Sequence, residues 1–284
     1  SRGSAGTNAS HHPGESEFLM LYYPQLSSGV LAQYPIAKQI SYRTVINTLP
    51  DGRTIAMADL GGAFVAWQLA YSGLSDAEWS TIEQLFTQVQ GSYGTFTFVD
   101  PAGNLLAWSE DLTQAVWEKD PLITVAGGFG DPLGGTGAAQ ITNGAQAAQG
   151  LRQNIAATSA YQYCFSVHLR GDTPVSLQMV VSSASGQITQ TANVGTEWSR
   201  ITLSGDLGGS DDSVSFGAEL PSGVRVYAFG FQVEAQPSAG LYRPTTDQGG
   251  VYSSSRFATD ELRRVATGPN QNGAQVTILS TIES

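Results

Sequence analysis

Positive charge is scarce in this chain of 284 residues. It has 11 Arg and two Lys against 24 Asp and Glu, which gives a formal net charge of −11. Charged residues of both signs make up 13% of the chain, about half of the roughly 25% usual in globular domains. Because a run of phosphates must be neutralised by Lys and Arg, we expect no nucleic-acid partner, and an anionic membrane surface is disfavoured for the same reason.

Long hydrophobic runs and cysteine are also lacking. No apolar run approaches the roughly 18–20 residues that span a bilayer, so we expect no membrane insertion. The one cysteine, Cys164, excludes an internal disulfide and a Cys-rich zinc site, and its alternating surroundings indicate a half-buried structural side chain. Residues 1–17 lack the apolar core of a signal peptide, and we expect a flexible N-terminal arm, native or added, in which nothing organises His11 and His12 as ligands.

Histidine is too rare to support the usual catalytic sites. Beyond the N-terminal arm the only imidazole belongs to His168, on an alternating stretch that indicates a solvent-facing strand position rather than a general base. Two glycine-rich runs, Gly127–Gly130 and Gly134–Gly137, do not join a strand to a helix as a phosphate-binding loop does. We therefore assign no catalytic, cofactor-binding or metal-binding residue and expect that the protein is not an enzyme.

Acidic side chains cluster most densely at Glu110-Asp111 and Asp211-Asp212. A glycosidase needs two carboxyl groups about 5–10 Å apart across a cleft, and proximity in the sequence does not supply that arrangement. The stretch 206–212 offers oxygen atoms to Ca²⁺, but it lacks the ordered spacing of a calcium loop and is more typical of a solvated turn. Bound calcium is left open.

Five tryptophans have the flat rings that can stack on sugars. They are Trp67, Trp79, Trp108, Trp117 and Trp198. We favour core packing over ligand contact for each of them and leave the ligand-binding residues unassigned.

The first part of the chain predicts strands and one helix. Strands are expected at 18–24, 37–50, 53–60, 63–71 and 95–101. Asp51-Gly52 supplies a hairpin turn. A capping box of Ser75 and Glu78 begins an amphipathic helix at about 75–90, with Gly91 as its C-cap. The helix carries an apolar stripe that should face a core: Trp79, Ile82, Phe86 and Val89.

The amino-acid composition changes at Asn104 and changes back at about residue 247. In between, the chain is rich in Gly, Ala, Ser, Thr and Gln, and no helix is indicated. Short alternating strands are expected at 161–169, 176–183, 199–204, 213–220 and 224–234. Turn signals about every ten residues predict a β-sandwich. The last part of the chain resumes with the strand-like stretch 251–257 and a strand at 275–279.

Two stretches outside this middle region carry a family resemblance. One is Gly91 to Pro101, which reads Gly-x-Tyr-Gly-x-Phe-Thr-Phe-Val-Asp-Pro and follows the capped helix. The other is Arg256 to Leu262, an Arg-Phe-x-x-Asp-x-Leu strand. Together they resemble bacteriophage distal-tail-like or minor tail proteins of the baseplate hub.

The middle region has a resemblance of its own. It opens with Asn104-Leu105-Leu106 followed by Trp117, and closes with Gly230–Glu234 and Tyr242-x-Pro244-Thr245. These motifs look like a module common in phage tail and receptor-binding proteins, which is similar to carbohydrate-binding β-sandwiches.

The resemblances imply a mainly β protein in two parts. A tail-hub β-domain, a barrel or sandwich with the one helix, would comprise residues 18–103 plus 247–284. A jelly-roll-like β-sandwich of residues 104–246 would be inserted into it. Insertion at an exposed turn is tolerated because the ends of the host chain there are already close together.

The same resemblances imply a structural virion protein of the tail tip or baseplate, assembled in the bacterial host cytoplasm. It would form a homo-oligomeric ring, a hexamer by resemblance, that joins the tail tube to hub or fibre proteins. Low charge suits a subunit that hides surface against neighbours. The alternative is a receptor-recognition protein that binds host surface glycan. A depolymerase is disfavoured because no His- or Cys-based site is present.

Overall fold

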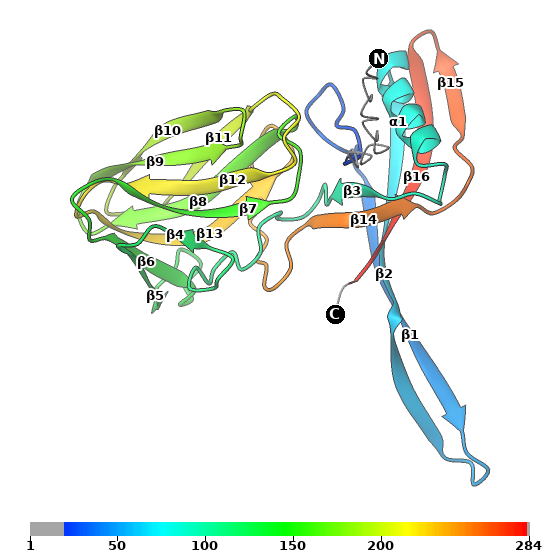
Figure 1. Cartoon of the computed structure of the whole chain (residues 1–284), viewed down its shortest axis with the longest axis horizontal. Helices are drawn as coiled ribbons and strands as arrows, with labels where there is room; N and C mark the ends of the chain where they lie inside the picture. The colour runs from blue at the N-terminus through cyan, green and yellow to red at the C-terminus, as the bar shows by residue number, and fades with distance from the viewer. Residues whose placement is uncertain (1–19, 283–284) are drawn as a thin grey trace, which may run out of the picture.

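The computed structural model describes residues 20–282, so the predicted N-terminal arm with His11 and His12 lies outside the described residues. Within that range the chain forms sixteen strands in three sheets and one helix (Figure 1). The prediction of a mainly β fold with one helix is confirmed. No helix in residues 20–282 is long and apolar enough to cross a membrane.

Six strands from both ends of the chain form an open sheet, the hairpin sheet. Its order is β1-β2-β16-β14-β3, with β15 also paired to β16. The strands are β1 (Ile36–Thr48), β2 (Thr54–Leu74), β3 (Phe96–Val99), β14 (Val251–Phe257), β15 (Arg264–Gly268) and β16 (Gln271–Thr281). The barrel form of the expected hub domain is wrong, because the edge strands β1 and β3 do not pair and the sheet stays open.

The helix packs on the hairpin sheet and begins as the sequence predicts. It is α1 (Asp76–Gln88), and the reciprocal bonds between Ser75 and Glu78 are both present. Its C-cap is Val89, not Gly91: Gln90 takes the left-handed conformation with φ 56°, and the N–H of Gly91 then reaches back to the Phe86 carbonyl at 2.9 Å. The helix therefore closes with a Schellman-type turn whose C-cap lies two residues before the expected Gly91.

Aromatic rings fill the space between the helix and the hairpin sheet. Phe257 lies 5.0 Å from Phe86 of the helix and 5.1 Å from Phe96, centroid to centroid. Trp67 is fully buried and contacts Phe98 at 4.9 Å. This core joins strands that are about 150 residues apart in the sequence.

Ten strands between residues 118 and 234 form a β-sandwich, as the texture of this region predicts. One sheet, the groove sheet, has the order β10-β9-β12-β7-β4, and the opposite sheet has the order β11-β8-β13-β6-β5. The groove sheet contains β4 (Glu118–Lys119), β7 (Gln149–Ile155), β9 (Val175–Ser182), β10 (Gln187–Val194) and β12 (Val214–Leu220). The opposite sheet contains β5 (Ile123–Phe129), β6 (Ala138–Asn143), β8 (Gln162–Gly171), β11 (Ser199–Asp206) and β13 (Arg225–Glu234). Fully buried aromatic side chains lie between them, among them Trp117, Tyr163, Phe165, Phe216 and Phe231.

Some expected strands differ from the structure. Of the strand expected at 18–24, residues 18 and 19 lie outside the described residues, and residues 20–24 form only an isolated bridge from Tyr22 to Thr97. The chain then turns at Leu26–Gly29, where the N–H of Gly29 donates to the Leu26 carbonyl at 2.8 Å. Strands β4, β5, β6, β7, β10 and β15 were not among those predicted. Strand β4 is two residues long, and the other five mix β-branched residues with Gly, Ala or Asn, which are depleted in strands, so local propensity indicates them only weakly.

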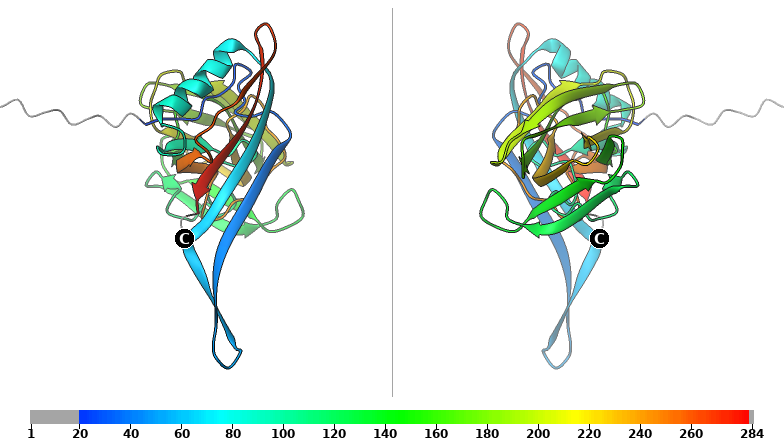
Figure 2. Two further views of the ribbon diagram at one scale, coloured as in Figure 1. Left: turned by 90° about the vertical axis from the view of Figure 1, so that its right-hand side faces the viewer. Right: turned by 90° about the vertical axis from the view of Figure 1, so that its left-hand side faces the viewer.

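The β1–β2 ribbon extends away from the rest of the molecule, as Figures 1 and 2 show from three directions. Its turn is the predicted one at Asp51-Gly52, where Gly52 has φ 84°. Strand β16 covers β2 only from Phe64 onward. We call residues 40–63 the hairpin arm.

Candidate functional site

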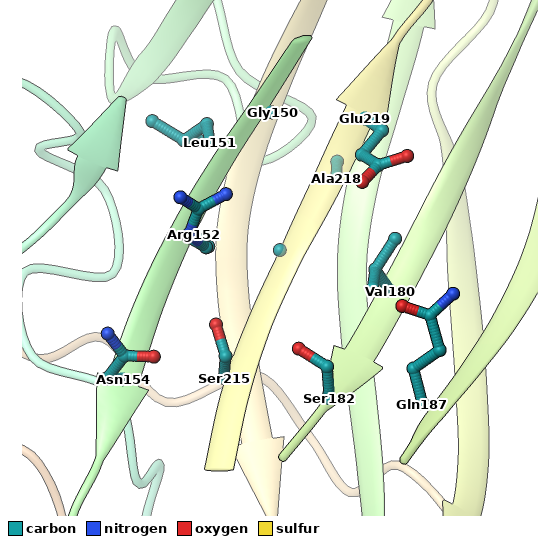
Figure 3. A pocket seen from close by; sticks show the side chains of 11 residues that line it. Gly150, Leu151, Arg152, Asn154, Val180, Ser182, Gln187, Ser215, Ala218 and Glu219 are labelled. Atoms are coloured by element: carbon teal, nitrogen blue, oxygen red, sulfur yellow. The ribbon is translucent and has the colours of Figure 1, made fainter. Parts of the chain in front are cut away.

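A polar hollow of about 300 Å³ lies on the outer face of the groove sheet (Figure 3). We call it the groove. Its lining comes from four adjacent strands: Gly150, Leu151, Arg152, Asn154, Val180, Ser182, Gln187, Ser215, Gly217, Ala218 and Glu219. Residues that alternate outward on β7, β12 and β9 therefore meet in one surface depression.

Strand register places these residues in rows across the sheet. Asn154 pairs with Ser215, which pairs with Ser182, and Figure 3 shows the three side chains next to one another. In the neighbouring row Gly217 stands between Arg152 and Val180. The pairing of β7 with β12 thus sets which polar groups face a ligand.

Gly217 leaves the middle of the groove without a side chain. A Cβ at this position would collide with the carbonyl oxygen of Leu151 and come within 2.8 Å of the Cβ of Arg152. The backbones of β7 and β12 approach too closely for any other residue, and the absence of a side chain also deepens the depression.

Acidic residues beside the groove hold two of its polar side chains. Arg152 lies 3.3 Å from Glu118 and 3.6 Å from Asp120. The amide nitrogen of Asn154 donates to the Glu118 carboxylate at 2.6 Å, which fixes the amide so that its oxygen is free to accept. The charge of Arg152 is therefore largely compensated, and Asn154 is oriented before a ligand arrives.

The remaining polar side chains of the groove have no protein partner. Within residues 20–282, four of them form no hydrogen bond or ion pair: Ser182, Gln187, Ser215 and Glu219. Two hydroxyl groups, an amide and a carboxylate are thus free to bond a ligand that both donates and accepts.

A second depression continues the groove toward the acidic pair. It shares Asn154, Ser182 and Ser215 with the groove and reaches Asp211 and Asp212. Asp211 accepts hydrogen bonds from the N–H and hydroxyl of Ser185, and the nearby Ser183 hydroxyl together with these bonds lowers the pKa of this carboxyl. These partners tie the loop between β11 and β12 to the hairpin loop between β9 and β10.

Asp212 is bonded elsewhere. Its carboxylate accepts a hydrogen bond from the Tyr22 hydroxyl at 3.0 Å, and burial, together with Asp212, raises the pKa of that phenol. No group of three or more His, Cys, Asp or Glu side chains suited to a metal ion occurs in the described part of the chain.

The other acidic pair and the glycine runs also serve local structure. Asp111 accepts bonds from Thr113 and Gln114, and these bonds lower its pKa. Partial burial favours a raised pKa for Asp131, but backbone N–H groups of Gly137 and Gly135 outweigh it, so the pKa is lowered. The run Gly134–Gly137 therefore wraps a carboxylate of the protein itself.

Cys164 and His168, which were considered above as a possible nucleophile and a possible general base, lie away from the groove. Cys164 is fully buried rather than half-buried, and burial raises the pKa of its thiol. His168 is half-buried on the outer face of the opposite sheet, where burial and the neighbouring Arg200 lower the pKa of the imidazole. Neither side chain has the geometry of a catalytic pair.

The tryptophans divide into two groups. Trp67, Trp79 and Trp117 are core residues, which confirms the favoured reading. Trp108 and Trp198 are only half-buried. None of the five lines the groove.

Sequence reasoning missed the groove residues. Asn154 and Arg152 lie on β7, for which no strand was predicted, although outward polar residues alternate with buried ones along Gln149–Ile155. The sequence signal for this strand was weak, because the inward-facing position 153 is a polar Gln and interrupts the apolar period of two.

Neither a protein-family model nor a curated protein matches the chain. Similar solved structures cover about half of it. The xylan-binding domain CBM22-1 of Paenibacillus barcinonensis Xyn10C is 16% identical over 49% of this chain and 98% of its own, with a TM-score of 0.40. The C-terminal family 22 carbohydrate-binding module of Clostridium thermocellum Xyn10B is 15% identical over 50% and 99%, with a TM-score of 0.39. The enzymatically active domain of tailspike protein 4 of bacteriophage CBA120 is 12% identical over 48% of this chain, with a TM-score of 0.39, and the match spans 22% of that protein.

Proposed function

We propose that the sandwich binds a glycan in the groove. The observation that carries this proposal is the row Asn154, Ser215 and Ser182 beside Gly217. There the free amide oxygen of Asn154 and two hydroxyl groups without protein partners surround a position with no side chain. Sugar hydroxyl groups both donate and accept, so they match this mixture of hydroxyl, amide and carboxylate groups. The volume lies at the lower end of the range for ligand sites, about 300–1,000 Å³.

We propose binding rather than cleavage. Among the described lining residues of the groove, Glu219 supplies the one carboxyl group. Hydrolysis by the usual glycosidase mechanism needs a second, available carboxyl about 5–10 Å away. The neighbouring Asp120 is already engaged, because it accepts a hydrogen bond from the N–H of Gly150 at 2.7 Å and lies 3.6 Å from Arg152. Two of the similar structures are carbohydrate-binding modules, which agrees with the proposal without carrying it.

Calorimetric titration of the full chain, after a glycan array has selected a ligand, tests the proposal. We expect Asn154→Ala to weaken binding about tenfold, because a lost hydrogen bond in a desolvated site costs about 1–2 kcal/mol. Ser176→Ala is the matched control, since Ser176 points outward from the same sheet but lies outside the groove. Absence of saturable binding on the array, or equal loss in both variants, would overturn the proposal.

We also propose that the chain is a structural virion protein whose hairpin arm joins it to neighbouring copies in a tail-tip or baseplate ring. Apolar side chains are exposed on both faces of the arm, among them Tyr42 at 75%, Ile46 at 64% and Met57 at 49% exposed. A two-stranded ribbon is marginally stable alone, and its open edges pair readily with another chain. The hexamer, the tail tube and the hub or fibre partners come from the family resemblance.

Mass measurement over a range of concentrations tests ring formation. We expect a defined oligomer that the double variant Tyr42→Ser, Ile46→Ser reduces to monomer. A monomeric mass at high concentration for the unaltered chain counts against self-assembly. The same measurement after mixing with tail-tube protein then separates a partner of another kind from a second copy.

A further inference from the structure

A row of aromatic and polar side chains crosses the outer face of the opposite sheet. The register pairs Arg170 of β8 with Tyr227 of β13, and Tyr227 with Gln140 of β6. Trp198 immediately precedes β11, whose first residue pairs with Leu169, so it stands beside Arg170. We call Trp198, Arg170, Tyr227 and Gln140 the arginine row.

Two rings hold the guanidinium group of Arg170 in place. Its central carbon lies over the Trp198 ring at 5.4 Å and over the Tyr227 ring at 4.7 Å from the centroid. The Tyr227 hydroxyl accepts a hydrogen bond from Gln140 at 3.0 Å, and Phe129 packs edge-on against Tyr227 at 5.3 Å. The guanidinium group contacts both the Trp198 ring and the Tyr227 ring, and the Tyr227 ring is itself held by Gln140 and Phe129. These contacts restrict the movement of the guanidinium group.

The held cation has no counterion from the protein. Within residues 20–282, Arg170 forms no ion pair or hydrogen bond, and its Nε is buried without a partner. The exposed Arg225, two residues before Tyr227 on the same strand, instead lies 3.9 Å from Asp172. In a chain with a net charge of −11, an arginine that is stacked but not paired with a carboxylate points to a negatively charged ligand.

The arginine row is partly exposed to solvent, since all four of its side chains are half-buried. It lies near the end of β8, eight residues from Gln162, where the sandwich contacts the N-terminal segment through Gln25. At about 3.3 Å per residue, that separation is roughly 25 Å. The row is also on the outer face of the sheet that does not carry the groove, so the two sites are independent.

We propose that the arginine row binds a carboxylate-bearing saccharide, such as a uronic acid unit of an acidic polysaccharide. The planar guanidinium can bond a carboxylate through two parallel N–H groups. The exposed parts of the Trp198 and Tyr227 rings contact the apolar face of the sugar. The sandwich then recognises an acidic sugar on one face and hydroxyl groups on the other.

The test uses tetragalacturonate and its methyl ester, which share a sugar backbone and differ in charge. We expect the full chain to bind the acid at least tenfold more tightly than the ester. Arg170→Gln should abolish that difference, and Arg170→Lys should restore part of it, since an ammonium group cannot form the paired bonds. Trp198→Ala should weaken binding of both ligands.

Arg225→Gln is the matched control, because it removes one positive charge from the same face. Melting temperatures of all variants separate loss of binding from loss of folding. Equal affinity for acid and ester, or an equal loss in Arg225→Gln and Arg170→Gln, overturns the proposal. Competition by acetate at the same carboxylate concentration shows a bare carboxylate site and also overturns it.

A groove variant distinguishes this inference from the proposed function. Asn154→Ala should bind tetragalacturonate as the unaltered chain does. Loss of acid binding in Asn154→Ala, with retention in Arg170→Gln, assigns the acidic sugar to the groove and overturns the arginine row.

Discussion

Strand β8 of the sandwich and strand β1 of the hairpin sheet are both long, and apolar and polar residues alternate along both. The apolar side chains of β8 are buried, whereas those of β1 are mostly exposed. In β8, Phe165 and Val167 are fully buried between two sheets. In β1, no residue is buried, and Tyr42 is the most exposed of its large apolar side chains. The difference shows that strand periodicity predicts a second layer but does not say which molecule supplies it.

Energetics sharpen the comparison. Burying one large apolar side chain stabilises a protein by about 1.5–3 kcal/mol. Strand β8 gains this stabilisation by packing within its own chain. The exposed side chains of the hairpin arm could gain it only by contact with another molecule. The sandwich thus buries its apolar residues within its own chain, whereas those of the hairpin arm stay exposed in the single chain. Substitutions in the buried cores and in the hairpin arm should therefore differ in their effect on stability.

The largest expected effect is in the core of the hairpin sheet. Phe257→Ala should destabilise this part by about 3–5 kcal/mol, because Phe257 is 3% exposed and lies between Phe86 and Phe96. Urea unfolding followed by two probes, one for each part of the chain, measures it. A change under about 1 kcal/mol would contradict the expected domain built from 18–103 plus 247–284.

A glycine change should affect the sandwich instead. Gly217→Ala should cost about 1–3 kcal/mol, because the new methyl group collides with the Leu151 carbonyl and the ladder between β7 and β12 must shift. Gly127→Ala is the control, since nothing lies within 4 Å of its added Cβ. Equal effects in the two variants would show that close approach of the backbones is not what requires glycine at position 217.

An intermediate effect with a pH signature is expected at the helix N-terminus. Burial alone would raise the pKa of Glu78, but hydrogen bonds from Ser27 and Ser75 outweigh it and lower the pKa from 4.5 to about 2. Because the folded-state pKa is depressed, the stabilisation is fully present above about pH 4.5 and is lost as the pH falls toward 2. Glu78→Gln should cost about 1 kcal/mol at pH 7.

Urea unfolding of both proteins at several pH values checks this. The stability difference between the unaltered chain and Glu78→Gln should shrink steadily between pH 5 and pH 2. A difference that does not depend on pH would mean that the carboxylate charge plays no part in capping.

The smallest effect on stability is expected in the hairpin arm. Tyr42→Ser should change the free energy of unfolding of dilute monomer by less than about 0.5 kcal/mol, because the side chain contacts little within its own chain. Leu69→Ala, on the covered part of the same ribbon, should cost about 2–5 kcal/mol. Comparable losses from both variants would show that the arm is stabilised within the monomer.

Local features were predictable where a few neighbouring residues determine the geometry. Ser75 with Glu78 predicted the start of the helix, and Asp51-Gly52 predicted the hairpin turn. The groove was not predictable in the same way, because it exists only when β7 pairs with β12, about 65 residues away. The order in which strands pair depends on packing across the whole sandwich, which local propensity does not encode.

The contacts between side chains on the outer faces of the sandwich could not be predicted from the sequence either. Trp198 looked like the other tryptophans in the sequence, and only the register of β11 with β8 places it beside Arg170. Alternation in the sequence predicts which residues of one strand share a face of the sheet, but not which residues of the neighbouring strands lie beside them.

The two stretches that enter and leave the sandwich run side by side. The N–H of Gly250 donates to the Asn104 carbonyl at 2.8 Å, and the N–H of Trp108 donates to the Thr246 carbonyl at 2.6 Å. A pull on the sandwich through a captured ligand therefore loads two strands in parallel rather than one. Two stretches joined by hydrogen bonds also restrict rotation of the sandwich relative to the hairpin sheet more than a single stretch would.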